Sequence, residues 1–216
     1  MSRPDLVIFD CDGVLVDSEP IALRINQQML ADLGWHLSSE EIVHRFVGRS
    51  IASNRAVVEE HLGRPLPDGW LDEFVARIHA AHDEELDRVD GITDALAGID
   101  ALGIATCVAS SGTHANIERS LRLVGLLERF AGRVFSATDV AHGKPAPDLL
   151  WHAAATLGVP PDRCVVVEDS RYGAQAARAA GMRCIGYAGG LTPADWLAGD
   201  DTVIVDDLRK VPEHLV

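Results

Sequence analysis

Basic residues are scarce in this sequence of 216 residues, which has 19 lysines and arginines against 33 aspartates and glutamates and a formal net charge of −14. Nucleic acids and anionic membranes are bound through broad basic faces, so we expect neither as a partner. A small anionic ligand remains compatible with this charge, because a binding site depends on the groups that lie nearest to it.

Long apolar runs and paired cysteines are also missing. No stretch approaches the ~20 apolar residues that span a membrane, and the N-terminus turns acidic too soon for a signal peptide, so we expect a cytoplasmic protein. The four cysteines form no CxxC pair, and we interpret them as buried thiols in a reducing compartment rather than as a zinc site or a disulfide framework: Cys11, Cys107, Cys164 and Cys184.

What the sequence does contain is a series of short apolar runs typical of β-strands. With 47% hydrophobic and 24% charged residues, the composition is that of an ordinary globular protein of one or two domains. Helical patterns separate the later runs, for example at 115–124, 148–157 and 174–180. This alternation predicts an α/β fold, a Rossmann-like doubly wound parallel sheet, with strands within residues 6–9, 104–110, 133–137, 163–169, 183–188 and 202–205.

One long segment interrupts the alternation. From Glu19 to about Arg88 there are only successive helical patterns, one of which opens with Ser38 and an acidic residue three positions later, as in a capping box. We therefore predict a helical insertion. The α/β core would comprise residues 1–17 and 89–216, and the insertion residues 18–88.

Two carboxylates follow the first apolar run in "LVIFDCDGVLVDSEP", residues 6–20. The run delivers Asp10 to the carboxyl end of a strand, and Asp12-Gly13 favours a turn just beyond it. Ligands of doubly wound sheets bind at these ends. A cation could neutralise the pair, or the two groups could act as nucleophile and proton donor; a purely structural pair, one making a turn and one a cap, is the alternative.

Four motifs in order resemble the signatures of the haloacid dehalogenase-like hydrolases, which are aspartate-dependent phosphotransferases with a Rossmann-like core. They are "DCDGVLVDSE" (10–19), "VASSG" (108–112), "HGKPAPD" (142–148) and "VVVEDSRYGAQAARAAG" (165–181). The resemblance covers essentially the whole chain, and it identifies the helical insertion with the small α-helical cap of this family.

The resemblance implies a mechanism. Asp10 would attack the phosphorus of the substrate and become an aspartyl phosphate, while Asp12 protonates the leaving alkoxide and later deprotonates the attacking water. Magnesium would be held by Asp10, the backbone carbonyl of Asp12 and Asp169, with Glu168 either a ligand or a neighbour of one. Mg²⁺ prefers oxygen ligands and offsets the repulsion between clustered acids and a phosphate dianion.

The second and third motifs imply the groups that bind phosphate. Ser110 matches the phosphate-binding hydroxyl, with the backbone N–H of Ser111 beside it and Gly112 allowing close approach. Lys144 matches the lysine that balances charge on the nucleophile and the phosphoryl group. We expect Asp148 to cap the helix that follows.

Departures from the family pattern narrow the activity. Dehalogenases lack an acid at the position of Asp12, and phosphonate hydrolases need a lysine in the cap, whereas no lysine precedes Lys144. A β-phosphoglucomutase-like enzyme usually has a histidine where this chain has Ala22, which favours a phosphatase over a mutase. A non-enzymatic binding role is disfavoured, because Asp10, Asp12, Lys144 and Asp169 are all present.

The first motif and "GRSI" (48–51) look closest to sugar-phosphate and 6-phosphogluconate phosphatases, with phosphoglycolate phosphatases as neighbours. The expected substrate is a small phosphorylated sugar or sugar acid, and Arg49 of the cap could contact a second anionic group.

His79 and His82 lie three positions apart on a predicted helix, but no third ligand accompanies them, so we assign them no metal. We expect a monomer, with a dimer as the alternative.

Overall fold

A six-stranded sheet forms the centre of the molecule. The computed structural model describes residues 3–47 and 51–216, and the side chains of these residues other than 51–53. The strands are β1 (Leu6–Phe9), β2 (Ala105–Ser110), β3 (Val134–Ser136), β4 (Cys164–Glu168), β5 (Arg183–Tyr187) and β6 (Thr202–Val205). They pair in parallel in the order β3-β2-β1-β4-β5-β6.

The central strands explain the unbroken apolar runs of the sequence. All four residues of β1 and all five of β4 are buried. Alternate side chains of β1 enter two separate hydrophobic cores, Val7 and Phe9 on one face and Leu6 and Ile8 on the other. A strand that is covered on both faces needs apolar residues at every position, as parallel sheets typically do.

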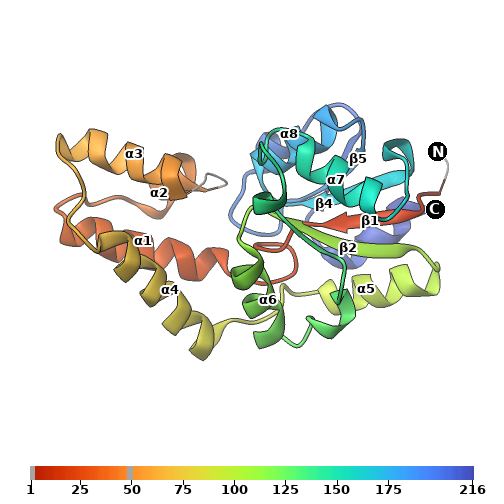
Figure 1. Cartoon of the computed structure of the whole chain (residues 1–216), viewed down its shortest axis with the longest axis horizontal. Coiled ribbons are helices and arrows are strands. Elements are labelled where there is room, and N and C mark those ends of the chain that lie inside the picture. Colours follow the sequence, from red (N-terminus) through yellow and green to blue (C-terminus); the bar gives the residue numbers. More distant parts are fainter. Residues whose placement is uncertain (1–2, 48–50) are drawn as a thin grey trace.

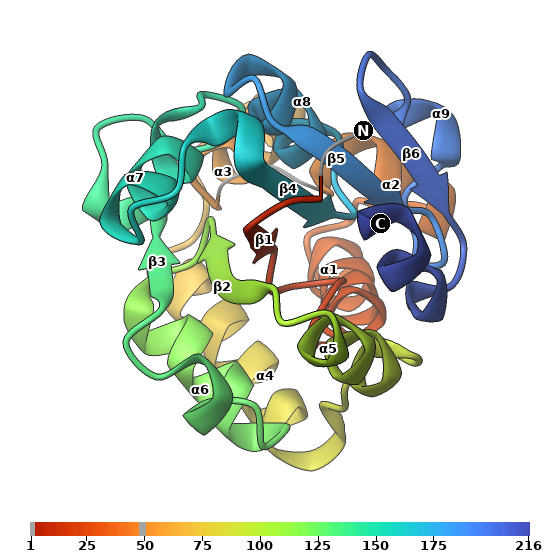
Figure 2. The same ribbon diagram turned by 90° about the vertical axis from the view of Figure 1, so that its right-hand side faces the viewer.

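Helices cover both faces of the sheet, as Figure 2 shows. On one face lie α5 (Ile92–Ala101), α6 (His114–Leu123) and the C-terminal 3₁₀ helix (Leu208–Leu215). On the other face lie α7 (Asp148–Thr156), α8 (Arg171–Ala179) and α9 (Ala194–Leu197). The predicted doubly wound α/β fold is confirmed. No helix in the described ranges combines the length and the apolar character needed to cross a bilayer.

Four further helices lie between β1 and α5 in the chain, and we call them the cap: α1 (Glu19–Asp32), α2 (Ser39–Phe46), α3 (Ile51–Leu62) and α4 (Trp70–Glu85). They have cores of their own, one around Trp35, Ile42 and Phe46 and one around Ile25 and Met29. The carboxyl end of β1 points toward the cap, while both chain termini lie at the opposite end of the sheet (Figure 1).

The predicted capping box opens α2. The Ser38 hydroxyl accepts a hydrogen bond from the Glu41 N–H (3.2 Å), and the Glu41 carboxylate accepts one from the Ser38 N–H (2.9 Å). These bonds satisfy two backbone donors that the helix start would otherwise leave unpaired.

Among the described residues, side chains on two sides of the cap contact the core. Arg119 of α6 donates to the backbone carbonyl of His79 (3.1 Å) and forms an ion pair with Asp83 (2.6 Å), both on α4. At the other side, the rings of His44 on α2 and Trp196 on α9 meet edge to face with their centroids 4.7 Å apart. These contacts hold the cap beside the carboxyl edge of the sheet.

Candidate active site

The turn after β1 places two carboxylates at the edge of the sheet. The Asp10 N–H donates to the carbonyl of Val167 (2.9 Å), which extends the β1–β4 pairing by one residue. The N–H groups of Leu15 and Val16 both reach the Cys11 carbonyl, at 2.9 and 3.1 Å, and fold the chain back on itself. Asp10 is therefore held by the sheet and Asp12 by the turn.

Gly13 is required at the centre of this turn. Its φ of 77° lies in the left-handed region, and a Cβ there would overlap the carboxylate of Asp169. Because β1 and β4 pair side by side, Asp10 and Asp169, the residues that follow them, lie close together. The missing side chain of Gly13 allows the Asp169 carboxylate to lie against the turn.

Three buried carboxylates gather at this point. Oxygen atoms of Asp10, Glu168 and Asp169 all lie within 4.8 Å of one another. Burial and the Glu168 carboxylate raise the pKa of Asp10, although Lys144 opposes the shift, and the same two causes raise the pKa of Asp169. Acids crowded in this way are stabilised as anions by a cation, and an all-oxygen donor set fits Mg²⁺.

Lys144 is the cation built into this cluster. Its Nζ donates to Asp10 Oδ1 (2.5 Å) and to Glu168 Oε2 (2.7 Å), and its side chain is only 3% exposed. Burial alone would lower the pKa of this lysine, but the two carboxylates outweigh burial and raise it, so the ammonium stays charged.

Glu168 uses both of its oxygens within the protein. Oε2 receives Lys144, and Oε1 accepts from the Ser170 N–H (3.0 Å). A Cβ at Gly173 would overlap this side chain, so the glycine in the first turn of α8 makes room for it. The Ser170 hydroxyl caps the same helix by accepting from the Gly173 N–H (3.0 Å). These contacts hold Glu168 beside the lysine.

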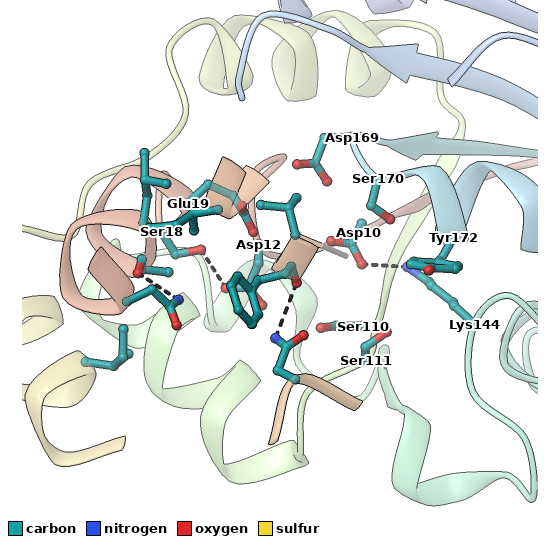
Figure 3. Close-up of a pocket in the computed structure, with 18 of the residues that line it drawn as sticks. Asp10, Asp12, Ser18, Glu19, Ser110, Ser111, Lys144, Asp169, Ser170 and Tyr172 are labelled. Carbon is teal, nitrogen blue, oxygen red and sulfur yellow. Dashed lines mark hydrogen bonds and ion pairs between the residues drawn. The ribbon is translucent and has the colours of Figure 1, made fainter. Parts of the chain in front are cut away.

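Asp12 is oriented separately from the cluster. The buried Ser18 donates from its hydroxyl to Asp12 Oδ1 (2.7 Å), as the dashed line in Figure 3 shows. The side chain of Asp12 does not belong to the three-carboxylate group, and it lines the same pocket as Asp10. The two acids of the first motif thus have different surroundings, as two groups with different tasks would need.

The second motif ends β2 at the same edge. Ser110 is buried, and its hydroxyl accepts from the Gly112 N–H (3.2 Å). The Gly112 carbonyl accepts from the Ser136 hydroxyl (2.6 Å), and Thr113 caps α6. Ser110 and Ser111 line the pocket, whereas Gly112 shapes the turn behind them.

These groups form the floor of a pocket of about 300 Å³ between the core and the cap. We define the floor as its core residues and the roof as the cap residues opposite. The floor contains Asp10, Asp12, Ser110, Ser111, Lys144 and Asp169, which Figure 3 labels together with Ser170 and Tyr172. The roof contains Glu19, Ala22, Leu23, Asn26, Ile42, Phe46, Val47, Asn54, Phe74, Ile78 and His82.

Comparison with known proteins identifies the family. The model of the haloacid dehalogenase-like hydrolases matches residues 4–181, which include all four motifs. The chain belongs to this family. It is a phosphatase of the family, because its curated relatives include several proteins named as phosphatases.

Three similar proteins illustrate the match. The 6-phosphogluconate phosphatase of Escherichia coli is 34% identical over 183 residues, 84% of this chain and 81% of the relative. Hexitol phosphatase B of the same organism is 30% identical over 217 aligned residues, 97% of this chain and 94% of the relative. A solved haloacid dehalogenase-like protein from Agrobacterium tumefaciens is 38% identical with a TM-score of 0.86, covering 98% and 97% of the two chains.

This hydrolase brings together nearly all the residues expected from its sequence. Asp10, Asp12, Ser110, Ser111, Lys144 and Asp169 share one pocket, and Glu168 contacts it through Lys144. Arg49 lies outside the described residues. One expectation is wrong: Asp148 does not cap α7. Pro147 occupies the capping position, so Asp148 falls inside the first turn, where its carboxylate lies 3.1 Å from His142.

The polar residues of the roof were not predicted. Asn26, Asn54 and His82 come from α1, α3 and α4, and each lines the pocket of the hydrolase. Glu19, the last residue of the first motif, lines it too; burial and Asp12 raise the pKa of its carboxyl group. A signal for His82 existed, because Phe74, Ile78 and His82 follow one another at four-residue spacing on a helix and so share a face.

Proposed function

We propose that this protein is a Mg²⁺-dependent phosphatase that hydrolyses small phosphorylated sugars or sugar acids through an aspartyl phosphate on Asp10. One observation carries the proposal: the Asp10 carboxylate lies at the floor of the pocket between core and cap, 2.5 Å from the buried Lys144 and beside Asp169. A carboxylate is a weak nucleophile that needs this kind of positioning next to positive charge.

The first step transfers the phosphoryl group to the protein. An oxygen of Asp10 forms a bond to phosphorus while the bond from phosphorus to the ester oxygen breaks. Asp12, protonated before the step, gives its proton to that oxygen, so the substrate leaves as an alcohol. Ser110, the Ser111 N–H and Lys144 would hold the non-bridging oxygens, and Lys144 would balance the charge that develops on them.

The second step regenerates the carboxylate. Asp12, now ionised, takes a proton from a water molecule as the water oxygen attacks phosphorus, and the bond between phosphorus and Asp10 breaks. Ser18 keeps Asp12 in place through both steps, because it holds one carboxylate oxygen and leaves the other free for the proton. Closure of the cap limits the water that reaches the aspartyl phosphate.

The magnesium site would use Asp10, Asp169 and the backbone carbonyl of Asp12. When bound, the ion neutralises the clustered acids and draws charge from the phosphoryl group. Glu168 is the remaining candidate ligand, but both of its oxygens already have partners in Lys144 and Ser170. We therefore propose that Glu168 orients Lys144 and lies next to the ion.

The proposed substrate class follows the size of the pocket and the names of the relatives. A pocket of about 300 Å³ suits a phosphorylated compound of the size of a pentose or hexose. The similar proteins are a 6-phosphogluconate phosphatase and a hexitol phosphatase. Ala22 lines the pocket at the position where a mutase would usually have histidine, which supports hydrolysis over phosphoryl transfer within a sugar. A cytoplasmic monomer remains our expectation.

Phosphate release from a panel of monoesters tests this proposal. We expect Mg²⁺-dependent release from 6-phosphogluconate, glucose 6-phosphate and sorbitol 6-phosphate, with slower release from phosphoglycolate and no conversion of β-glucose 1-phosphate to glucose 6-phosphate. EDTA should stop the reaction, and Mg²⁺ in excess should restore it. A folded protein that releases no phosphate from any monoester in the presence of Mg²⁺ would contradict the proposal.

A further inference from the structure

Two residues that line the pocket each carry a buried polar atom without a partner. Within residues 3–47 and 51–216, five buried side-chain nitrogen or oxygen atoms have no hydrogen-bond partner: Asn54 Oδ1, His82 Nε2, Arg119 Nη1, Arg129 Nε and Thr192 Oγ1. The first two belong to the roof of the pocket, and the other three residues do not line it. A buried polar atom without a partner is costly, and such atoms in native proteins often await a ligand or water.

His82 is the more buried of the two roof residues. It is 8% exposed and lies one and two turns beyond Ile78 and Phe74 on the face of α4 that lines the pocket. Burial lowers its pKa, although the nearby Asp12 carboxylate opposes the shift. The ring is therefore neutral near pH 7, with one nitrogen that donates and one that accepts.

The amide of Asn54 is already oriented. Its Nδ2 donates to the carbonyl of Phe46 (3.3 Å), which leaves Oδ1 as the free acceptor. Asn26 is arranged in the same manner, since its Nδ2 donates to the Ala22 carbonyl (2.9 Å). The roof thus combines fixed amide groups with a neutral imidazole.

We infer that His82 and Asn54 bind hydroxyl groups of the substrate's alcohol portion and so select polyhydroxylated phosphate esters. A hydroxyl both donates and accepts, which suits a neutral histidine ring and an amide oxygen. Leu23, Ile42, Phe46, Phe74 and Ile78 surround them in the roof, and a hydroxyl-rich ligand would gain little from these side chains alone. This inference rests on the proposed phosphatase function and adds the groups that recognise its substrate.

His82→Phe is the main test variant. It removes the polar atoms and keeps a ring of similar size. We expect kcat/KM for sorbitol 6-phosphate to fall about tenfold or more relative to kcat/KM for n-propyl phosphate, an alkyl ester without a free hydroxyl, because one buried hydrogen bond is lost. His82→Gln, which restores a polar group near the position of Nε2, should recover most of the ratio. Asn54→Leu should shift the ratio in the same direction.

His79→Phe is the matched control. His79 lies on the same helix but does not line the pocket, and its backbone carbonyl still meets Arg119 in the variant. The ratio of the two substrates should change by less than about twofold there, well below the loss of one hydrogen bond.

Thermal unfolding separates recognition from a structural role. If Nε2 of His82 is free for a ligand, His82→Phe removes an unpaired buried atom, and the melting temperature should stay the same or rise. A lowered melting temperature with equal loss of activity on both substrates would show a structural histidine and overturn the inference. An unchanged substrate ratio in a folded His82→Phe protein would overturn it as well.

A binding measurement keeps the inference testable apart from turnover. In protein carrying Asp10→Asn, calorimetric titration with sorbitol 6-phosphate, 6-phosphogluconate and ribose 5-phosphate should give tighter binding than n-propyl phosphate. Adding His82→Phe should remove about tenfold of that advantage. If the unmodified protein released no phosphate but the Asp10→Asn protein still bound the hydroxylated esters more tightly, only the proposed function would be contradicted. Equal affinity for all four esters would contradict the inference.

Discussion

The floor and the roof of the pocket differ in how completely their polar groups are satisfied. On the floor, Lys144 donates hydrogen bonds to Asp10 and to Glu168, which lies behind it. Glu168 also accepts from the Ser170 N–H, and Asp12 accepts from the Ser18 hydroxyl. On the roof, Asn54 and His82 each retain a buried atom without a partner. The floor is pre-arranged for one reaction, whereas the roof awaits the part of the substrate that varies.

The elements that build the two surfaces account for this difference. Three floor residues, Asp10, Ser110 and Asp169, end or directly follow strands of one sheet, whose register fixes them relative to each other, and the loop before α7 adds Lys144. Roof residues come from the four cap helices α1 to α4 or directly follow one of them, and these helices pack through their own small cores. Groups on a sheet edge can be positioned within tenths of an ångström, as chemistry requires. Helix packing tolerates exchange of side chains, which lets a cap recognise different alcohols.

Replacing the proposed nucleophile of the floor should have the largest effect. Asp10→Asn should lower kcat by at least about 10⁴-fold for every substrate, because no other group on the floor can form the phosphoryl intermediate. Phosphate release and circular dichroism on the same sample would check activity and folding. Activity above a hundredth of wild type in folded protein would remove Asp10 from its assigned role.

Asp12 should affect substrates unequally. Asp12→Ala is expected to slow sorbitol 6-phosphate about 10²–10⁴-fold, because its alkoxide must be protonated as it leaves. Hydrolysis of p-nitrophenyl phosphate should slow by about tenfold or less, since nitrophenolate leaves without a proton. Single-turnover rates with both esters would measure the difference. Equal slowing would contradict a proton donor at this position.

Lys144 provides a test with a natural control, because Lys210 is the other lysine of the chain. Lys144→Met should reduce kcat about 10²–10³-fold, since it removes the buried cation that faces Asp10. Lys210 is exposed and contacts Asp206 through its Nζ (2.5 Å), so Lys210→Met should change kcat by less than about twofold. A similar loss in both variants would show that the charge of Lys144 has no special role.

The smallest expected effect is a change in melting temperature when Mg²⁺ binds in the absence of substrate. Because three buried carboxylates repel one another on the floor, Mg²⁺ at 100 times its dissociation constant should raise the melting temperature by about 5–10 °C. Asp169→Asn should at least halve this rise, and NaCl of equal ionic strength should not reproduce it. Differential scanning fluorimetry in EDTA and in MgCl₂ would measure the shift. Equal stabilisation by NaCl would argue against a specific site.

The strands of the sheet could be predicted because burial on both faces requires continuous apolar runs, which are visible in the sequence. All six predicted apolar runs contain a strand, and the run at residues 6–9 matches β1 at both ends. The amphipathic helix α5 (Ile92–Ala101) was not singled out, and the role of Asp148 was wrong because Pro147 took the capping position. Helix ends depend on local competition between neighbouring residues, which a motif does not reveal.

The site was predictable on the floor and not on the roof. Asp10, Ser110 and Asp169 each stand at the end of a strand, where a parallel sheet must bring them together. His82 looked like one of two histidines on a helix, with no metal partner and no assigned role. The spacing of Phe74, Ile78 and His82 indicates that they share one face of α4, but which surface this face meets depends on how α4 packs against α1 and α6.

From the sequence alone follow the fold class, the family and the candidate residues of the floor. Strand periodicity and short motifs at strand ends are local patterns, and a parallel sheet brings the ends of its strands to one edge. Only the tertiary structure decided which cap side chains face that place and which of their polar atoms lack a partner. Asn26, Asn54 and His82 lie on three separate helices. Apolar packing between those helices, and not any spacing along the chain, brings them to one wall of the pocket.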